Sequence, residues 1–388
     1  MMKSPKIRFK GFDGDWEQRK LGDVAQEFKS GNSLKADEID ITGDYPVYGG
    51  NGLRGYTSTY NHDGEYALIG RQGALCGNMN YSAGKAYFTE HAVVVKADEN
   101  NDTRFLYYML DTMNLGQYSD QSAQPGLAVN KLVKLENSFP KKEEQQQIGA
   151  YFRSLDHLIT LHQKKFEQLT ILKKYMLQKM FPQNGSDKPE IRFDGFTDDW
   201  EQRKFGETVI IERGGSPRPI DAFITDDENG LNWVKIGDAP EQGNYITKTA
   251  EKIRPEGLKK TREVHPGDLI LSNSMSFGRP YIMAIDGCIH DGWLLIRDEE
   301  KRYDLKFLCQ MLGTEQMLAQ YRAMAAGSTV NNLNKELVGN TEVKVPSIAE
   351  QAKIGEYFSK VDDLITLHQQ KCDELRNAKK FMLQNMFI

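Results

Sequence analysis

The sequence predicts an α/β protein in which two globular α/β domains are separated by an antiparallel coiled coil of two long helices, with internal pseudo-twofold symmetry. Two repeats and one difference predict this fold. A helix-forming stretch at residues 144–181 returns almost intact at 350–387, and a shorter opening motif at residues 5–24 returns at 189–208. The regions between the repeats share almost no sequence, so one scaffold carries two dissimilar domains.

Each long stretch carries an apolar seam whose residues alternate steps of four and three, which is typical of a coiled coil. A single stripe of this kind is more often the buried face of a core helix. Both copies, however, run for about 38 residues, or roughly 57 Å, which is far longer than an ordinary helix of three or four turns. Both seams skip one position, at Lys173 and Lys379. The residues expected to pair the helices are Ile148, Phe152, Leu155, Ile159, His162, Ile354, Phe358, Val361, Ile365 and His368.

Two of these seam residues are histidines. His162 and His368 lie near the midpoints of their helices, where antiparallel helices cross. We expect the two rings to face each other and to fix the register, as polar seam residues do. The alternative is that each ring lies at the edge of the seam with its nitrogens in water.

The repeats divide the chain into four consecutive parts. These are a first domain with its opening motif (1–142), a spacer helix (143–183), a second domain with its opening motif (184–348) and a second long helix (349–388). Packing the helices antiparallel would place the two domains at opposite ends. We expect each opening motif to dock its domain on the helices, with binding to a partner protein as the alternative.

Composition excludes several classes of protein. With 388 residues, 39% of them hydrophobic, the chain can form two packed cores. No apolar run reaches the roughly 18 residues that cross a bilayer, and the first residues lack the apolar segment of a secretion signal, so we expect a cytoplasmic location. Four scattered cysteines argue against a disulfide framework and against a zinc site. Because the formal charge is −5, a DNA-binding surface must be local or shared with partners.

No convincing catalytic motif is present in the sequence. Gly50, Gly52 and Gly55 satisfy G-x-G-x-x-G, but no helix is expected to follow, so we reject a dinucleotide site. Residues 342–344 have the E-x-K spacing of a metal-dependent nuclease, yet they fall on a predicted strand. An acid–base group of His265, His290 and Asp291 is supported by composition alone. We therefore expect no catalytic residue, no metal and no cofactor bound by this chain.

Both domains read as short strands joined by glycine-bearing loops. Strands are expected at residues 66–70, 92–96, 233–236 and 268–271, and helices at 103–113, from 305 to 317 or beyond, and from about 333. The loops are rich in Arg, Lys, Asn, Gln and Ser, which pair with base edges and phosphates, although a capped helix start alone is more often plain capping. The candidate DNA-binding residues are Asn51, Arg54, Tyr56, Arg71, Gln72, Asn78, Gln124, Asn130, Lys131, Ser216, Arg218, Lys235, Ser274, Ser276, Arg279, Ser328, Thr329, Asn331, Asn332 and Lys335.

Several of these motifs resemble one known family over essentially the whole chain. The W-E-Q-R-K openings from Trp16 and Trp200, and the P-x-x-x-E-Q-x-x-I-G-x-Y-F starts of the helices from Pro140 and Pro346, resemble the specificity (S) subunit of type I restriction-modification systems. YPVYG with RQG in the first region, and WVKIGD with GRP in the second, resemble two common types of its target-recognition domain.

The resemblance implies a non-catalytic DNA sequence-specificity subunit. Each target-recognition domain would read one half of a bipartite site in double-stranded DNA, and the helices would set the gap. It also implies two modification (methyltransferase) subunits, which carry S-adenosylmethionine, and restriction (translocase) subunits, which use ATP and Mg. One alternative is a self-sufficient DNA methyltransferase or nuclease with a divergent site. Another is a scaffold protein that does not touch DNA, in which exchanging a domain would leave the methylated sequence unchanged.

Overall fold

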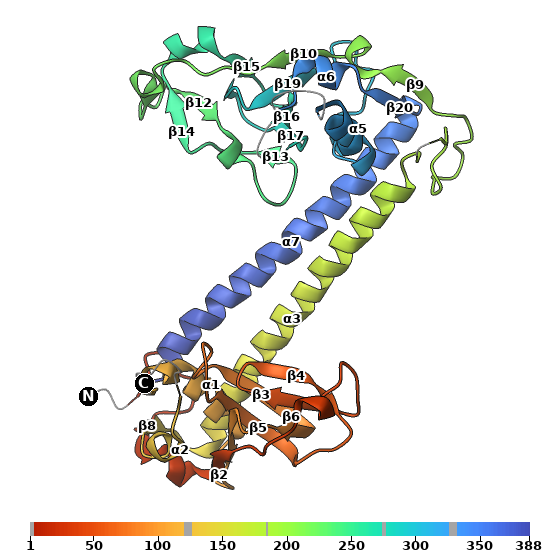
Figure 1. Cartoon of the computed structure of the whole chain (residues 1–388). Coiled ribbons are helices and arrows are strands. Elements are labelled where there is room, and N and C mark those ends of the chain that lie inside the picture. Colours follow the sequence, from red (N-terminus) through yellow and green to blue (C-terminus); the bar gives the residue numbers. More distant parts are fainter. Residues whose placement is uncertain (1–3, 120–125, 184, 274–276, 326–331) are drawn as a thin grey trace. The chain divides into compact units, whose positions relative to one another are not determined.

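The computed structural model describes residues 4–119, 126–183, 185–273, 277–325 and 332–388. Its packing defines two compact units, unit 1 with residues 1–161 and 371–388, and unit 2 with residues 162–370. Each unit combines one α/β domain with a part of both long helices, α3 (Lys142–Lys179) and α7 (Ile348–Met386) (Figure 1). This division follows packing, whereas the four parts predicted above follow the sequence repeats.

The helix segments run antiparallel within each unit. In unit 1 the ring of Phe152 lies 5.8 Å from that of Phe387. Further along α3, the carbonyl oxygen of Ile159 accepts a contact from the thiol of Cys372, which precedes Phe387 in the chain. In unit 2, the ring of Phe181, just beyond the end of α3, lies 6.2 Å from that of Phe358, near the start of α7. Seven of the ten expected pairing residues are buried and three are half-buried, namely Ile159, His162 and His368.

Unit 1 is built on one six-stranded mixed sheet. In spatial order its strands are β2 (Ala25–Ser30), β7 (Ala92–Ala97), β5 (His62–Gly70), β6 (Met79–Phe88), β3 (Tyr45–Gly49) and β4 (Gly52–Thr57). Helix α1 (Thr103–Thr112) packs on β5, β6 and β7 and begins at Asp102, whose carboxylate accepts the N–H of Phe105 at 2.8 Å. The short helix α2 (Val129–Leu132) follows.

Unit 2 contains two five-stranded sheets. The first has the order β10 (Ile210–Arg213), β19 (Trp293–Arg297), β16 (Leu269–Ser272), β17 (Pro280–Met283) and β13 (Tyr245–Ile246). The second has the order β11 (Ile224–Thr225), β14 (Glu251–Ile253), β12 (Leu231–Val234), β18 (Gly287–Ile289) and β15 (Arg262–Val264). Side chains alternate along β16, so that Leu269 and Leu271 join the core with helix α4 (Leu305–Leu312), whereas Ile270 joins the core with the second sheet.

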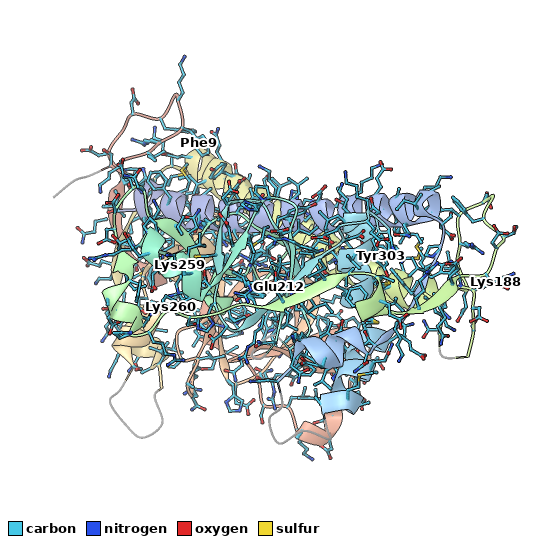
Figure 2. All side chains as sticks on the ribbon, turned by 90° about the horizontal axis from the view of Figure 1, so that it is seen from above. Phe9, Lys188, Glu212, Lys259, Lys260 and Tyr303 are labelled. Atoms are coloured by element: carbon cyan, nitrogen blue, oxygen red, sulfur yellow. The ribbon has the colours of Figure 1, made fainter. Side chains whose placement is uncertain are left out.

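The opening motifs dock within their own units. In unit 1, β1 (Glu17–Lys20) pairs with β8 (Glu136–Phe139), and Phe9 lies over the first turns of α3, its ring 5.8 Å from that of Tyr151 (Figure 2). In unit 2, β9 (Glu201–Lys204) pairs with β20 (Glu342–Val345), so the E-x-K spacing lies on a paired strand as expected. Among the described residues, no helix is both long and apolar enough to span a membrane.

One local prediction was wrong in detail. The helix expected from residue 305 to 317 or beyond stops at Leu312, and α5 (Glu315–Ala325) begins after Gly313 and Thr314, whose hydroxyl accepts the N–H of Met317. The glycine-rich segment after Tyr48 forms the tight turn of a β3–β4 hairpin, with only Gly50 and Asn51 outside the strands.

The two units share a common strand order and matching backbone hydrogen bonds, here called the shared frame, which is not apparent from their sequences. The order β2-β7-β5-β6 of unit 1 matches the order β10-β19-β16-β17 of unit 2, and in each unit an aspartate-capped helix, α1 or α4, follows these strands. Backbone hydrogen bonds agree position by position. Gly31 donates to the carbonyl of Ala92 at 3.0 Å, and Gly214 donates to that of Trp293 at 2.9 Å.

Candidate nucleic-acid interface

Several predicted DNA-binding residues of unit 1 line one hollow of about 440 Å³. The β3–β4 hairpin, the end of β5 and the turn before β7 form its wall. The lining residues are Gly50, Asn51, Arg54, Gln72, Gly73 and His91. The hollow therefore presents a guanidinium, two amides and an imidazole, all of which can form hydrogen bonds with base edges.

Glycines let the hairpin approach this hollow closely. A Cβ on Gly49 would lie 2.6 Å from Cδ of Arg54, and one on Gly50 would lie 2.9 Å from the carbonyl oxygen of His91. Gly52 has a φ of +95°, which side-chain-bearing residues rarely adopt. The G-x-G-x-x-G pattern thus serves a tight hairpin, and no helix follows it, in agreement with the rejection of a dinucleotide site.

The turn before β7 lines this hollow with His91, and Glu90 is its neighbour in the turn. Nδ1 of His91 lies 3.1 Å from Oε1 of Gln72, which orients the ring, and Nε2 lies 3.6 Å from Oε1 of Glu90. Arg71 donates to the backbone carbonyl of Glu90 at 3.4 Å. Oε2 of Glu90 is buried and has no hydrogen-bond partner in the described part of the chain.

Unit 2 has a larger hollow, of about 990 Å³, at the loop that follows β10. Predicted DNA-binding residues lining it are Ser216, Arg218 and Lys235, and it is also lined by Trp233, Glu251 and His290. Nζ of Lys235 lies 2.5 Å from Oε1 of Glu251, so the lysine charge is paired across the hollow. A Cβ on Gly214 would lie 2.2 Å from the carbonyl oxygen of His290, so only glycine permits this approach.

An acid–histidine pair lies at this hollow, with His290 in the lining and Asp291 next to it in the chain. Ser216 donates its hydroxyl to Oδ1 of Asp291 at 2.9 Å, and Nε2 of His290 lies 3.0 Å from the same oxygen. The N–H of Gly292 donates to Nδ1 of His290 at 2.9 Å, so in the neutral ring Nε2 carries the proton. The serine contacts the carboxylate rather than the imidazole, so the set is not a nucleophilic triad. The structure does not unite the predicted acid–base group, because His265 pairs with Asp286 at 2.8 Å.

The other predicted residues that the structure describes lie outside the two hollows. Arg279 donates to the carbonyl of Glu241 at 2.8 Å and stacks over the ring of Tyr281. Tyr56 is half-buried on β4, and Arg71 is half-buried after β5. Exposed positions are occupied by Asn78, Asn130, Lys131, Asn332 and Lys335. The predictions that lie outside the described residues are Gln124, Ser274, Ser276, Ser328, Thr329 and Asn331.

Sequence reasoning missed His91 and Glu251 as lining residues of the hollows, and Glu90 as the neighbour of His91. A signal was available for the first two, because Glu90 and His91 directly precede the buried run AVVV of β7, just as His290 and Asp291 shortly precede WLLI of β19. A polar turn ahead of a fully buried strand reaches the surface at the end of the sheet.

The described residues contain no group of three or more His, Cys, Asp or Glu side chains that could hold a metal ion. All four cysteines are free thiols. Cys288, Cys309 and Cys372 are buried, and Cys76 is half-buried. Burial raises the pKa of Cys309 to about 12, which keeps this thiol protonated and unreactive.

With this fold and these two hollows in view, comparison with known proteins defines the class. The chain belongs to the type I restriction modification DNA specificity domain family, whose model matches residues 13–170 and 197–377. It is a DNA sequence-specificity subunit of the type I restriction-modification class.

Individual relatives agree with this assignment. The Type I restriction enzyme EcoprrI specificity subunit of Escherichia coli is 42% identical over 156 residues, which is 39% of each chain. The MjaVIII specificity subunit of Methanocaldococcus jannaschii is 23% identical over 396 residues, covering 94% of this chain and 90% of the relative.

Solved structures share the fold. The crystal structure of the type I restriction-modification S subunit from M. genitalium matches 99% of both chains with a TM-score of 0.73 at 16% sequence identity. A chain solved to explain complex assembly and conformational transition of the type I R-M system matches 96% of this chain and 97% of its own, with a TM-score of 0.52 at 17% identity.

Proposed function

We propose that this subunit reads a bipartite site in double-stranded DNA, one half-site per unit, with the paired helices setting the unread gap. The observation that carries the proposal is the shared backbone frame with unlike side chains in its hollows. Phosphate contacts would set the register of each domain, and the hollow side chains would read base edges. The hollow of unit 1 offers Asn51, Arg54 and Gln72, whereas that of unit 2 offers Ser216, Arg218 and Lys235, so the two half-sites should differ.

We further propose that the chain is not itself catalytic and works in a complex. Two modification subunits would carry S-adenosylmethionine and methylate the DNA, and restriction subunits would use ATP and Mg. The study of complex assembly that includes a similar chain supports this arrangement. The formal charge of −5 also favours it, because a DNA channel shared with partners does not require a basic balance from this chain alone. The complex would act in the cytoplasm.

Helix length provides the main test. One heptad inserted after Lys165 in α3 and one after Leu364 in α7 should keep the seam in register, because these positions lie at matched distances from His162 and His368. The insertion adds about 10 Å of helix. Methylome sequencing of a host that expresses the variant with its modification subunit should show a longer gap and unchanged half-sites. Altered half-sites with an unchanged gap would refute the proposed role of the helices.

Two further measurements separate the alternative functions. The purified chain alone should neither bind S-adenosylmethionine nor modify DNA, whereas a self-sufficient methyltransferase or nuclease would. Exchange of the first domain for that of another family member should change one half-site only. A scaffold that does not touch DNA would leave the methylated sequence unchanged after the same exchange.

A further inference from the structure

The shared frame makes it possible to match the turns of the two units residue by residue. Arg71 donates its N–H to the carbonyl of His91 at 2.9 Å, and Asn273 donates to that of Gly292 at the same distance. With the matching bonds to Ala92 and Trp293, these contacts make His91 equivalent to Gly292. One residue earlier, Glu90 is therefore equivalent to Asp291.

Both turns thus carry a carboxylate at the same place in the frame, each beside a histidine that contacts it. The histidine follows the acid in unit 1 and precedes it in unit 2, with Nε2 to carboxylate distances of 3.6 Å and 3.0 Å. Outside this pair of residues the two turns have nothing in common, since one reads Thr-Glu-His and the other His-Asp-Gly. The acid is the shared chemical feature of two otherwise unrelated turns, each of which contributes its histidine to the lining of a hollow.

Each acid retains capacity to accept a hydrogen bond. The Glu90 side chain is 37% exposed, and the contact of its Oε1 among the described residues is the 3.6 Å approach of Nε2 of His91, so this oxygen can still accept from a ligand. Asp291 uses Oδ1 for both Ser216 and His290, and its side chain is 34% exposed. These contacts hold Asp291 by one oxygen and leave Oδ2 able to accept from a ligand.

We propose that Glu90 and Asp291 are specificity-determining residues, each accepting a hydrogen bond from the exocyclic amino group of an adenine or cytosine in its own half-site. This inference rests on the proposed function. In the major groove only N6 of adenine and N4 of cytosine donate, whereas guanine and thymine present acceptors that a carboxylate repels. His91 and His290 are positioning residues that orient the carboxylates, together with Gln72 and Ser216.

The test uses the chain assembled with its modification subunit. Glu90→Gln and Asp291→Asn keep the side-chain shape but add an amide donor, so each should relax or switch one base position of one half-site, with a loss of discrimination of about tenfold or more. The other half-site should not change. The measurement is methylome sequencing, followed by methylation rates on duplexes that vary at that position.

A matched control exists in unit 2. His265 and Asp286 form another exposed acid–histidine pair. His265 precedes β16 and Asp286 precedes β18, whereas Asp291 follows β18, so the control pair lies at the other end of these strands. Asp286→Asn should leave the motif and the discrimination unchanged. Glu90→Ala and Asp291→Ala provide second variants, and thermal unfolding establishes that each variant is folded.

The outcomes distinguish the two proposals. If the wild-type complex methylates a bipartite site but Glu90→Gln and Asp291→Asn discriminate within twofold of it, the specificity role is overturned while the proposed function stands. A uniform loss of methylation across all sequences would mean that the acids only support the fold, and would also overturn it. If the wild-type complex reads no bipartite site, the proposed function itself fails.

Discussion

The Nδ1 atoms of His162 and His368 lie 2.9 Å apart, and the two ring centroids are separated by 5.1 Å. The rings face each other as the seam periodicity predicts. A contact between two Nδ1 atoms requires one nitrogen to donate and the other to accept, so at least one ring must be neutral at that nitrogen. The hydrogen bond can therefore form when both rings are neutral or when one ring is protonated, and it is lost when both rings are protonated.

This contact predicts a loss of stability in acid. Burial, first, and then the charges of His162 and Lys165 lower the pKa of His368 below its ordinary value of 6.5. The unfolded chain thus binds more protons than the folded chain once the pH falls below about 6.5, so the pair's contribution is present above that pH and declines as the pH falls towards the lower folded pKa. Thermal unfolding at pH 8 and pH 5.5 measures the decline.

The double variant His162→Leu/His368→Leu replaces the pair by apolar seam residues and should unfold with a smaller difference between the two pH values. His265→Ala serves as the control, because Asp286 raises the pKa of His265 and its contribution has the opposite sign. An unchanged pH difference in the double variant would exclude the pair as its source.

The lysines that interrupt the seams form ion pairs between the helices. Nζ of Lys173 lies 2.6 Å from Oδ1 of Asp362, and Nζ of Lys379 lies 2.7 Å from Oδ1 of Asp156, its counterpart in the repeat. Single variants Lys173→Ala and Asp362→Ala with the double variant should give a coupling free energy of about 1–2 kcal/mol, since both groups are mostly buried. Urea unfolding measures it.

Asp362 should matter more than Asp156. Asp362 also accepts from Asn244 and Gln310, whereas Asp156 accepts one further bond, from the hydroxyl of Tyr108. Asp362→Ala therefore leaves more donors unpaired. An equal loss of stability in Asp156→Ala would show that these additional bonds contribute nothing.

Buried carboxylates near the starts of α3 and α7 make each opening motif essential to its unit. Arg192 binds Glu350 through two bonds of 2.7 and 2.8 Å, and Glu350 is 1% exposed. Arg192→Ala would leave this buried carboxylate without its charged partner and should lower the unfolding free energy by about 3–5 kcal/mol. Arg192→Lys should restore little, because an ammonium cannot form the same two-bond contact.

The exposed pair of Arg203 and Glu201 is the control for this prediction. Arg203→Ala should change the unfolding free energy by less than about 1 kcal/mol. Equal effects of the two alanine variants in chemical unfolding would contradict the importance of burial.

Gly214 should tolerate no side chain. Its added Cβ would lie 2.2 Å from a backbone oxygen of the turn before β19, and the backbone must shift to relieve this clash. Gly214→Ala should lower the unfolding free energy by about 1–3 kcal/mol and weaken recognition of the second half-site. Gly237→Ala is the matched control in the same unit, because nothing lies within 4 Å of its added Cβ. Similar stability and methylation in both variants would refute the close-approach argument.

The helices were predictable because their pattern repeats. Steps of four and three, read twice, predicted the antiparallel seam and the facing histidines. The partners of Lys173 and Lys379 were not predictable in the same way, because an aspartate on the polar face gives no periodic signal. The ends of the long helices differed from the prediction by only a few residues, as is usual for frayed termini.

The common frame of the domains was invisible in the sequence. Gly31 and Gly214, or Arg71 and Asn273, occupy equivalent places through backbone hydrogen bonds, which do not depend on side-chain identity. Loop chemistry alone did not single out His91 and its neighbour Glu90, whose signal in the sequence is their place directly before the buried run of β7. From the sequence, Arg279 was a candidate for DNA contact. In the structure its guanidinium donates to the backbone carbonyls of Glu241 and Gly243 and holds their loop.

The composition of unit 1 constrains the order in which the protein can be assembled. Residues 371–388 belong to unit 1, and Phe387 packs there against Phe105 and Phe152. The ribosome must therefore synthesise all of residues 162–370 before this core can close, whereas unit 2 is a single uninterrupted stretch. During translation the core of the earlier domain therefore remains without Phe387 and its neighbours. A chain that ends in α7 after Gln370 but before Phe387 would have a complete unit 2 and an incomplete unit 1.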